Sequence, residues 1–442
     1  MEPSSTEPRC LLLAPCSEGE AHAPLFGLTA VERTVLAFRR AGVREFWIVG
    51  EPAAAATALA SLRAGPCRKI RVRTCDAALP ALPREERFFV ARTDCYYDRR
   101  LVARFVAGAT RSCGIVVAVD LRADALTAHA GAARVALLRG LDSRPAAPGS
   151  YGPGRLRCVG RGLVSADGVL AGLALGTSAL ARALDDFAPD ASRLARALTF
   201  VAEREPIETF AVAELWQELT EGGDFLLARR KVLAGAVGIA DGVIARHVNR
   251  PISRRITERL LLRDVKPWQM SLIVFALTLA AGGSFAVGHA GTGGMLAQLA
   301  SVMDGVDGEL ASVRYQDSPF GGVYDALLDR VGDAAVIGGM TLYAWAMGAG
   351  HSAVVLGFAA VAGSSLSMLV KEKYGTQFRQ PYTEEREGRF RWLLLGRDGR
   401  LFLALVAGLT GHVEAVLAYI AVGTHVHAGL RIYRIRAEAL AS

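Results

Sequence analysis

The sequence lacks paired cysteines, and its opening residues lack the pattern of a signal peptide. Its seven cysteines have no C-x-x-C spacing and an odd total, and all lie in the first part of the chain. They are Cys10, Cys16, Cys67, Cys75, Cys95, Cys113 and Cys158. This usage predicts neither a disulfide framework nor a zinc site, and it indicates a reducing compartment. The opening MEPSSTEPRCLLLAP has no basic end followed by an apolar run, so we expect the first domain to stay in the cytoplasm.

Basic residues are absent from three long stretches in the second half of the chain. No Lys or Arg occurs in residues 268–313, 331–370 or 401–430. Each stretch is long enough for two membrane-spanning helices of about 20 residues apiece. The sequence therefore predicts six spans, at about 268–288, 292–313, 321–347, 352–371, 400–411 with the preceding WLLLG, and 413–432.

The joints between these predicted spans differ in charge. HAGT, GAGHS and TGH carry no Lys or Arg, whereas RYQDSPF, KEKYGTQFRQPYTEEREGRFRW and the tail RIYRIR carry them repeatedly. By the positive-inside rule, we expect a multi-pass protein of the cell (inner) membrane with both termini on the cytoplasmic side. A soluble helical bundle is the alternative, and the three stretches without basic residues argue against it.

The rest of the chain has two other patterns. Residues 1–206 alternate short apolar runs such as EFWIVG and GIVVAVD with helical patterns, which predicts an α/β domain with a Rossmann-like parallel sheet. Residues 207–266 are rich in arginine and predict basic amphipathic connector helices along a membrane face. Residues 267–442 form the predicted all-α transmembrane domain of six helices. The net charge of +8 suits an anionic membrane surface, and we expect no nucleic-acid partner.

Paired aspartates lie inside the apolar part of the chain. Asp304 and Asp307 are three residues apart and Asp325 and Asp329 are four apart, so each pair lies on one face of a predicted helix. Ionisable groups within a membrane span are functional candidates, because hydrocarbon makes each one costly. Carboxylates this close repel one another unless a cation neutralises them, and hard divalent cations prefer oxygen ligands. The pattern predicts a Mg²⁺ or Mn²⁺ site suited to phosphoryl chemistry.

The same segment resembles the CDP-alcohol phosphotransferase (phosphatidyltransferase) family, whose motif is D-x-x-D-G-x-x-A-R, eight residues, then G-x-x-x-D-x-x-x-D. The matching positions are Asp304, Asp307, Gly308, Ala311, Gly321, Asp325 and Asp329. The Arg of the motif is replaced by Ser312, and Arg314 is the nearest basic residue. The resemblance implies an integral-membrane enzyme that transfers a substituted phosphate from a CDP-alcohol to an acceptor alcohol with release of CMP.

The resemblance also implies roles for individual residues. All four motif aspartates would coordinate the metal, and Asp329 would also be the catalytic base that deprotonates the acceptor hydroxyl. The residues implied in CDP-alcohol binding are Gly308, Ala311, Ser312, Arg314 and Gly321. Arginines in HVNRPISRRITERL and LLLGRDGRLF would bind acceptor or phosphate, and those of the first segment would serve equally well for lipid head groups. These are Arg250, Arg254, Arg255 and Arg397.

The first domain has a strand, a polar loop and then PLFGLTAVERTVLAFRRAGVREFWIVG, an order that resembles sugar-phosphate nucleotidyltransferases. Their first strand leads into a G-x-G-x-R loop and a Pro-Lys, whereas the loop here, PCSEGEAHAPLF, has one glycine, two glutamates and no Lys or Arg. A triphosphate is bound mainly by positive charge and free amides, so we predict that this domain is catalytically degenerate. Asp94 and Asp98 lie near the family's metal-binding Asp, but a turn or helix cap accounts for them equally well.

Three functions remain open from the sequence alone. The first is a phosphotransferase with a CDP-inositol-like donor and a polyol-phosphate or lipid-alcohol acceptor. The second is a phospholipid head-group synthase that uses CDP-diacylglycerol and has a regulatory front domain. The third, from another class, is a cation-coupled membrane transporter, which predicts internally repeated halves that the sequence does not show. Membrane lipid is an expected partner, and the family resemblance implies a homodimer.

Overall fold

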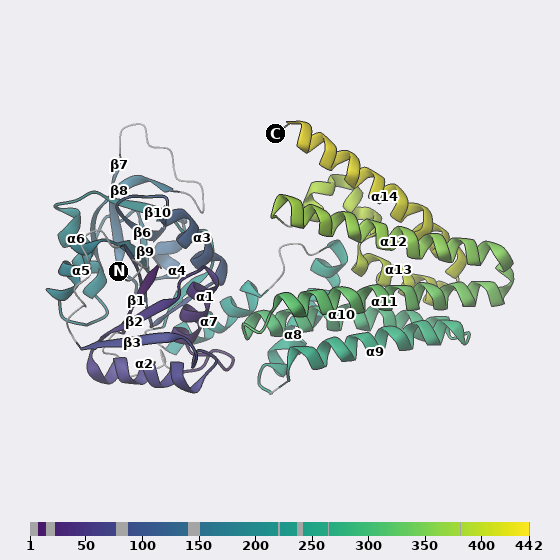
Figure 1. Ribbon diagram of the computed structural model, residues 1–442, viewed down its shortest axis with the longest axis horizontal. Helices are drawn as coiled ribbons and strands as arrows, with labels where there is room; N and C mark the ends of the chain where they lie inside the picture. The colour runs from purple at the N-terminus through teal and green to yellow at the C-terminus, as the bar shows by residue number, and fades with distance from the viewer. Residues whose placement is uncertain are drawn as a thin grey trace, which may run out of the picture. The chain divides into compact units, whose positions relative to one another are not determined.

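The computed structural model describes residues 8–14, 23–76, 87–139, 151–219, 222–236, 242–263, 265–380 and 382–441. The chain divides into two compact units, residues 1–235 and 236–442 (Figure 1). The first unit is an α/β domain and the second is helical, as the sequence predicts.

The main sheet of the first unit has the strand order β3-β2-β1-β4-β9-β6-β10-β8-β7. Its strands are β1 (Arg9–Ala14), β2 (Glu45–Gly50), β3 (Arg71–Asp76), β4 (Phe88–Arg92), β6 (Ile115–Asp120), β7 (Arg134–Arg139), β8 (Tyr151–Gly160), β9 (Gly168–Gly176) and β10 (Ile207–Ala211). The predicted parallel pairing holds for β3-β2-β1-β4 and for β6 with β10. Strand β9 runs antiparallel to both β4 and β6, so the sheet is mixed rather than fully parallel.

Residues 207–218 differ from the prediction, because they form strands instead of the start of a helical connector. Strand β10 pairs with β6 and β8 in the main sheet, and β11 (Trp216–Glu218) pairs with β5 (Cys95–Tyr97) in a second sheet. In β10, four of the five residues are buried and only Glu208 is exposed, which is the pattern of an interior strand. Residues 207–211 therefore form a strand because they are buried between β6 and β8, although the residues that follow have a helical pattern.

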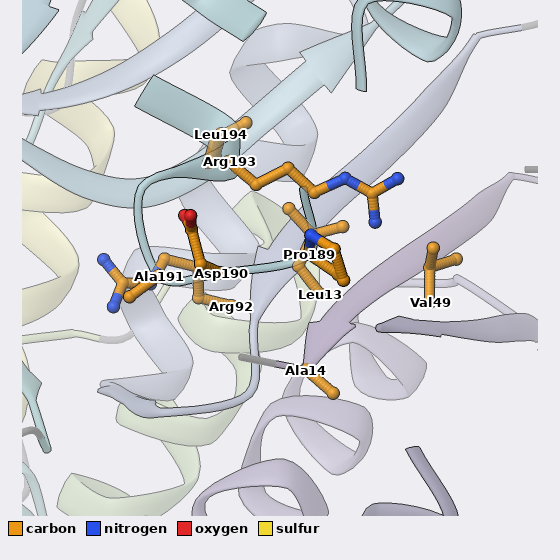
Figure 2. Close-up of a pocket in the computed structure, with 9 residues that line it drawn as sticks. All are labelled: Leu13, Ala14, Val49, Arg92, Pro189, Asp190, Ala191, Arg193 and Leu194. Atoms are coloured by element: carbon orange, nitrogen blue, oxygen red, sulfur yellow. The ribbon is translucent and has the colours of Figure 1, made fainter. Parts of the chain in front are cut away.

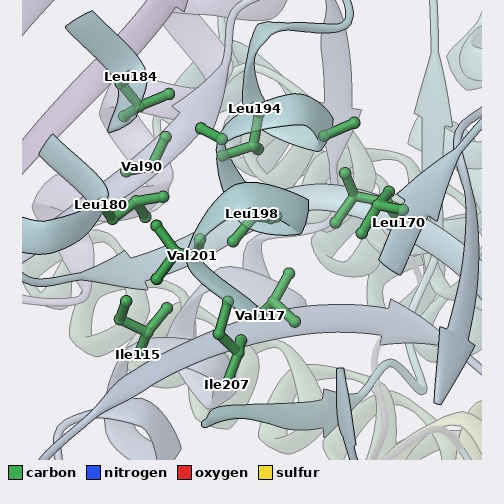
Figure 3. Close-up of a cluster of buried hydrophobic side chains, with 14 of the residues drawn as sticks. Val90, Ile115, Val117, Leu170, Leu180, Leu184, Leu194, Leu198, Val201 and Ile207 are labelled. Carbon is green, nitrogen blue, oxygen red and sulfur yellow. The ribbon is translucent and has the colours of Figure 1, made fainter. Parts of the chain in front are cut away.

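Helices pack on both faces of the main sheet. They are α1 (Ala30–Arg40), α2 (Pro52–Ala64), α3 (Arg99–Ala109), α4 (Ala125–Ala128), α5 (Ser178–Asp185) and α6 (Arg193–Ala202), whereas α7 (Gly222–Gly235) packs on β11 of the second sheet. Successive side chains of a strand point to opposite faces. Accordingly Phe89 contacts the rings of Phe38 on α1 and Phe105 on α3, whereas Val90 joins the apolar cluster of α5 and α6. Figure 3 shows that cluster around Leu198 and Ile207.

The second unit is a bundle of long helices. Its elements are η2 (Ala245–Asn249), α8 (Arg250–Leu260), α9 (Pro267–Ala286), α10 (Ala290–Val313), α11 (Pro319–Ala344), η3 (Trp345–Ala349), α12 (Gly350–Phe378), η4 (Glu384–Leu393), α13 (Arg397–Thr410) and α14 (Val413–Ala441). Helices α9 to α14 lie close to the six predicted ranges. Among the described residues, three helical segments are long and apolar enough to cross a membrane: Pro267–Ala286, Pro319–Phe378 and Val413–Leu440.

Glycines allow backbone-to-backbone contact between helices of the bundle. A Cβ atom on Gly339 of α11 would lie 2.1 Å from the carbonyl oxygen of Gly282 on α9. A Cβ atom on Gly408 of α13 would lie 2.2 Å from the carbonyl oxygen of Ala290 on α10. Small residues at helix crossings are typical of membrane bundles, where van der Waals contact drives association. These two crossings fix the spacing of the helices that carry the paired aspartates.

A buried ion cluster holds η4 against α14 and α12. Glu387 is 3% exposed, and its Oε1 accepts a hydrogen bond from Nε of Arg431 at 2.8 Å. Its Oε2 lies 3.0 Å from Nε2 of His427. Arg431 also donates from Nη1 to the carbonyl oxygen of Ser367 on α12, at 2.7 Å. The segment between α12 and α13 is therefore anchored by charge-assisted contacts at its centre.

Candidate active site

Four helices of the second unit line one small cavity that is open to solvent. Helix α10 supplies one aspartate pair and α11 the other, α9 supplies an apolar and hydroxyl wall, and α13 supplies an arginine. The lining residues are Ser271, Val274, Phe275, Thr278, Asp304, Asp307, Asp325, Leu328, Asp329 and Arg397. The four aspartates that the sequence predicts as metal ligands thus line the same space.

The aspartates of the cavity differ in exposure and partners. Asp307 is 7% exposed, and its Oδ2 accepts a hydrogen bond from Oγ of Ser271 on α9 at 2.6 Å. The side chain of Asp304 is 40% exposed and that of Asp329 is 23% exposed. Asp307 is therefore fixed by the protein, whereas the other two carboxylates are open to a ligand entering the cavity.

Arg397, the first residue of α13, lies between carboxylates of both pairs. Its Nη1 is 2.9 Å from Oδ2 of Asp304 and its Nη2 is 2.8 Å from Oδ1 of Asp329. Its Nε is 3.8 Å from Oδ1 of Asp333, which also pairs with Arg400. The sequence predicts Arg397 as a phosphate ligand, and in the structure its contacts are with the acidic residues of the cavity.

The donor set of the cavity fits a divalent cation in chemistry. Four carboxylates face one guanidinium, so negative charge remains in excess, and carboxylate oxygens are the ligands that Mg²⁺ and Mn²⁺ prefer. Within the residues that the structure describes, no three acidic, imidazole or thiol groups converge closely enough to hold a metal ion as they stand. Binding of one cation by these carboxylates would therefore require their side chains to move from the positions seen here.

The remaining motif residues lie outside the lining of this cavity. Ser318 caps α11 by accepting a hydrogen bond from the amide of Gly321 at 3.0 Å. A Cβ atom on Gly308 would meet nothing within 4 Å, so open space adjoins the helix there. Ser312 is buried, and Arg314 donates hydrogen bonds to the carbonyl oxygens of Val265 and Arg263. Ala311 is half-buried on the same helix. Arg314 therefore holds the segment before α9 through these hydrogen bonds. The role of Gly308, Ala311, Ser312, Arg314 and Gly321 in CDP-alcohol binding remains a prediction.

Helix α8 is docked on α10 through a glutamate that sequence reasoning missed. Glu309 is 1% exposed and accepts hydrogen bonds from Arg250 Nη1 at 2.8 Å, Ser253 Oγ at 2.9 Å and Thr257 Oγ1 at 2.6 Å. Arg250 is thus engaged with Glu309, whereas Arg254 and Arg255 are exposed. Glu309 lies two residues after Asp307, and an acidic residue inside a predicted span was the available signal.

Replacing Glu309 by Ala should lower the free energy of unfolding by about 3–5 kcal/mol, because it leaves the half-buried Arg250 without its carboxylate. Thermal unfolding in detergent would measure the change. Glu258→Ala is the matched control, since Glu258 is an exposed residue of the same α8. Equal unfolding temperatures for the two variants would contradict the docking role of Glu309.

The two aspartates noted in the first unit have structural partners. Asp98 caps α3 by accepting a hydrogen bond from the amide of Arg100 at 2.8 Å, which is the helix-cap alternative. Asp94 is fully buried. Its Oδ1 accepts a hydrogen bond from Nε of Arg92 at 2.9 Å, and its Oδ2 accepts one from Nη2 of Arg92 at 2.5 Å. The same Nη2 lies 2.6 Å from Oε1 of Glu218. Arg92 thus pairs with both buried carboxylates, and Nη2 of Arg161 lies 3.4 Å from Oε1 of Glu218.

A second cavity lies beside this ion trio in the first unit. It opens at the carboxyl ends of β1, β2 and β4, the edge where ligands bind in open α/β sheets (Figure 2). Ala14, Val49 and Arg92 line it from the strands, and residues 189–191, Arg193 and Leu194 line it from the start of α6. The described walls are mostly apolar.

Comparison with known proteins identifies the class of the second unit and then relatives of the whole chain. Residues 267–427 match the model of the family described as CDP-alcohol phosphatidyltransferase. The chain is 33% identical over 427 residues to the bifunctional IPC transferase and DIPP synthase of Rubrobacter xylanophilus. This alignment covers 92% of this chain and 89% of that protein. The chain therefore belongs to the CDP-alcohol phosphatidyltransferase family, and it is a CDP-alcohol phosphotransferase.

Two further proteins are similar to parts of the chain. The phosphatidylinositol phosphate synthase of Mycobacteroides abscessus is 33% identical over 121 residues, which cover 26% of this chain and 52% of that protein. The solved structure of the inositol-1-phosphate CTP transferase from T. maritima aligns with a TM-score of 0.38 and 14% identity, covering 51% of this chain and 96% of that chain.

Proposed function

We propose that the cavity between α9, α10, α11 and α13 transfers the phosphoinositol group of a CDP-inositol-like donor to a polyol phosphate, with release of CMP. The observation that carries the proposal is that four carboxylates and Arg397 from three helices line one space. The similarity to the bifunctional IPC transferase and DIPP synthase over nearly the whole chain supports this choice of donor.

The aspartates and Arg397 of the cavity would have different roles in the transfer. The four aspartates would hold Mg²⁺ or Mn²⁺, which when bound neutralises the diphosphate and stabilises the charge that develops on the leaving CMP. Asp329 would take the proton of the acceptor hydroxyl while that oxygen forms the new bond to phosphorus and the bond to CMP breaks. Arg397 holds one oxygen of Asp329, which fixes the orientation of this carboxylate.

We also propose that the first unit no longer transfers a cytidylyl group. Its PCSEGEAHAPLF segment has no Lys or Arg, and Arg92 already forms ion pairs with Asp94 and Glu218, so neither carboxylate is free to bind the metal ion of a triphosphate. The second unit would lie in the membrane as six spans with cytoplasmic termini. The three sufficiently apolar segments and the charge of the joints support this arrangement.

The similarity to the phosphatidylinositol phosphate synthase favours a second candidate, in which the donor is CDP-diacylglycerol. That function needs only the membrane unit and leaves the first unit a regulatory role. Both candidates use the same carboxylates and release the same nucleotide, so they differ in the donor alcohol alone.

The deciding experiment is CMP release by the full-length protein in detergent, with CDP-inositol or CDP-diacylglycerol offered beside inositol phosphate. We expect release from CDP-inositol that EDTA abolishes and Mg²⁺ restores, and no pyrophosphate from CTP and inositol phosphate. Release only from CDP-diacylglycerol would establish the second candidate. No CMP release from either donor would overturn the catalytic proposal. Pyrophosphate release from CTP and inositol phosphate would show that the first unit is active.

A further inference from the structure

The position of Arg397 is fixed by the first turn of α13. Its neighbour Asp398 accepts hydrogen bonds from Ser301 Oγ of α10 at 2.7 Å and from Asn249 Nδ2 at 3.2 Å. One turn later, Arg400 donates to the carbonyl oxygen of Leu395 at 2.9 Å. The backbone of Arg397 is therefore held on both sides, and its side chain, 9% exposed, extends into the cavity.

The guanidinium of Arg397 bridges the two helices that carry the aspartate pairs. Each of its two terminal nitrogens contacts one carboxylate, Asp304 on α10 and Asp329 on α11. The side chain of Arg397 is buried, whereas those of Asp304 and Asp329 are partly exposed, so both ion pairs lie where the protein meets the open space of the cavity. Any divalent cation that uses the same oxygens must share them with this guanidinium or displace it.

We propose that Arg397 is a built-in counter-cation of the acidic cavity, which occupies Asp304 and Asp329 before a divalent cation binds and lowers the affinity of the cavity for that cation. The inference rests on the proposed metal site. It assigns Arg397 a positioning role, since the arginine acts through the two carboxylates.

Direct measurement of Mn²⁺ binding tests this role without any assay of activity. Free Mn²⁺ is measured by electron paramagnetic resonance during titration of the full-length protein in detergent. Arg397→Met should bind Mn²⁺ at least about tenfold more tightly than the wild type, because the cation no longer competes with a tethered positive charge. Arg397→Lys, which offers one contact in place of two, should bind several-fold more tightly and serves if the Met variant does not fold.

Arg330→Met is the matched control for the general loss of one positive charge. Arg330 follows Asp329 directly on α11, but its guanidinium pairs with Glu372 at 2.6 Å. The affinity of the Arg330→Met variant for Mn²⁺ should stay near the wild-type value. Unchanged or weaker binding by both Arg397 variants, or an equal gain in Arg330→Met, would overturn the inference.

Chemical rescue separates competition from a merely structural effect. Added methylguanidinium should weaken Mn²⁺ binding in Arg397→Ala, where it can occupy the vacated position, and should leave the wild type unaffected. No effect on Arg397→Ala would contradict the proposal. Loss of Mn²⁺ binding in Asp307→Asn tests the metal site by itself, because Asp307 is bonded to Ser271 rather than to Arg397. Binding that survives this substitution would overturn the proposed metal site, whereas an intact site insensitive to Arg397 would overturn this inference alone.

Discussion

Replacing Asp329 by Asn should reduce CMP release by about a thousandfold or more, because an amide can neither accept the proton of the acceptor hydroxyl nor carry the charge that a metal ligand needs. The change is isosteric, and Asp329 is partly exposed in the cavity, so the protein should fold. Single-turnover CMP release at saturating Mg²⁺ measures the chemical step, and the thermal unfolding temperature verifies the fold.

Asp317→Asn is the matched control for Asp329→Asn. Asp317 is an exposed residue between α10 and α11 and is not among the residues that line the cavity. It should retain activity within a factor of about two, as expected for a surface substitution away from the site. Comparable losses in the two variants would mean that charge near the cavity mouth, rather than the Asp329 carboxylate, controls the reaction.

Glu387→Gln should lower the free energy of unfolding by about 3–5 kcal/mol, because it removes the carboxylate that pairs with the buried Arg431. Chemical or thermal unfolding in detergent measures the loss. Glu372→Gln is the control, since Glu372 forms an exposed pair with Arg330 and should cost about 0–1 kcal/mol. A loss of the same small size in Glu387→Gln would show that the cluster does not anchor η4.

The same carboxylate gives the stability a defined pH dependence. Burial alone would raise the pKa of Glu387, but contact with His427 and the charge of Arg431 outweigh burial and hold this pKa below its ordinary value of 4.5. A carboxyl group with a lowered folded-state pKa stabilises the protein above its unfolded-state pKa, and this contribution is lost as the pH falls toward the folded-state value. The wild type should therefore lose stability below about pH 4.5, and Glu387→Gln should lose less over that range.

The sequence predicts the helical unit more completely than the sheet. Stretches without Lys or Arg give the positions of α9 to α14, because charge and apolar length are local properties of a chain. The direction of β9 depends on which strands it joins, and a continuous buried run such as residues 168–176 has the same appearance in either direction. The strands at residues 207–218 were mistaken for helix for the same reason, since their partners β6 and β5 are distant in the sequence.

The site shows a similar division between local and distant information. The spacing of the aspartates places each pair on one helix face and so predicts two helices that present four carboxylates, and the structure shows that all four line one cavity. The contacts of Arg397 join residues more than sixty positions apart, and those of Glu309 reach back to α8, so neither pairing follows from spacing. The hydrogen bonds of Arg314 to the carbonyl groups before α9 also do not follow from its place beside the motif, and its predicted role in donor binding stays a prediction.

The contact of Gly282 with Gly339 limits how the bilayer can act on the enzyme. Main-chain atoms of α9 and α11 already touch there, so lateral pressure from the lipids cannot bring these helices closer. Asp329 lies ten residues before Gly339 on the same helix, about 15 Å along its axis. Compression of the bilayer therefore cannot narrow the crossing of α9 and α11 at this level, and we expect adaptation to a different membrane at the lipid-facing surfaces of the bundle.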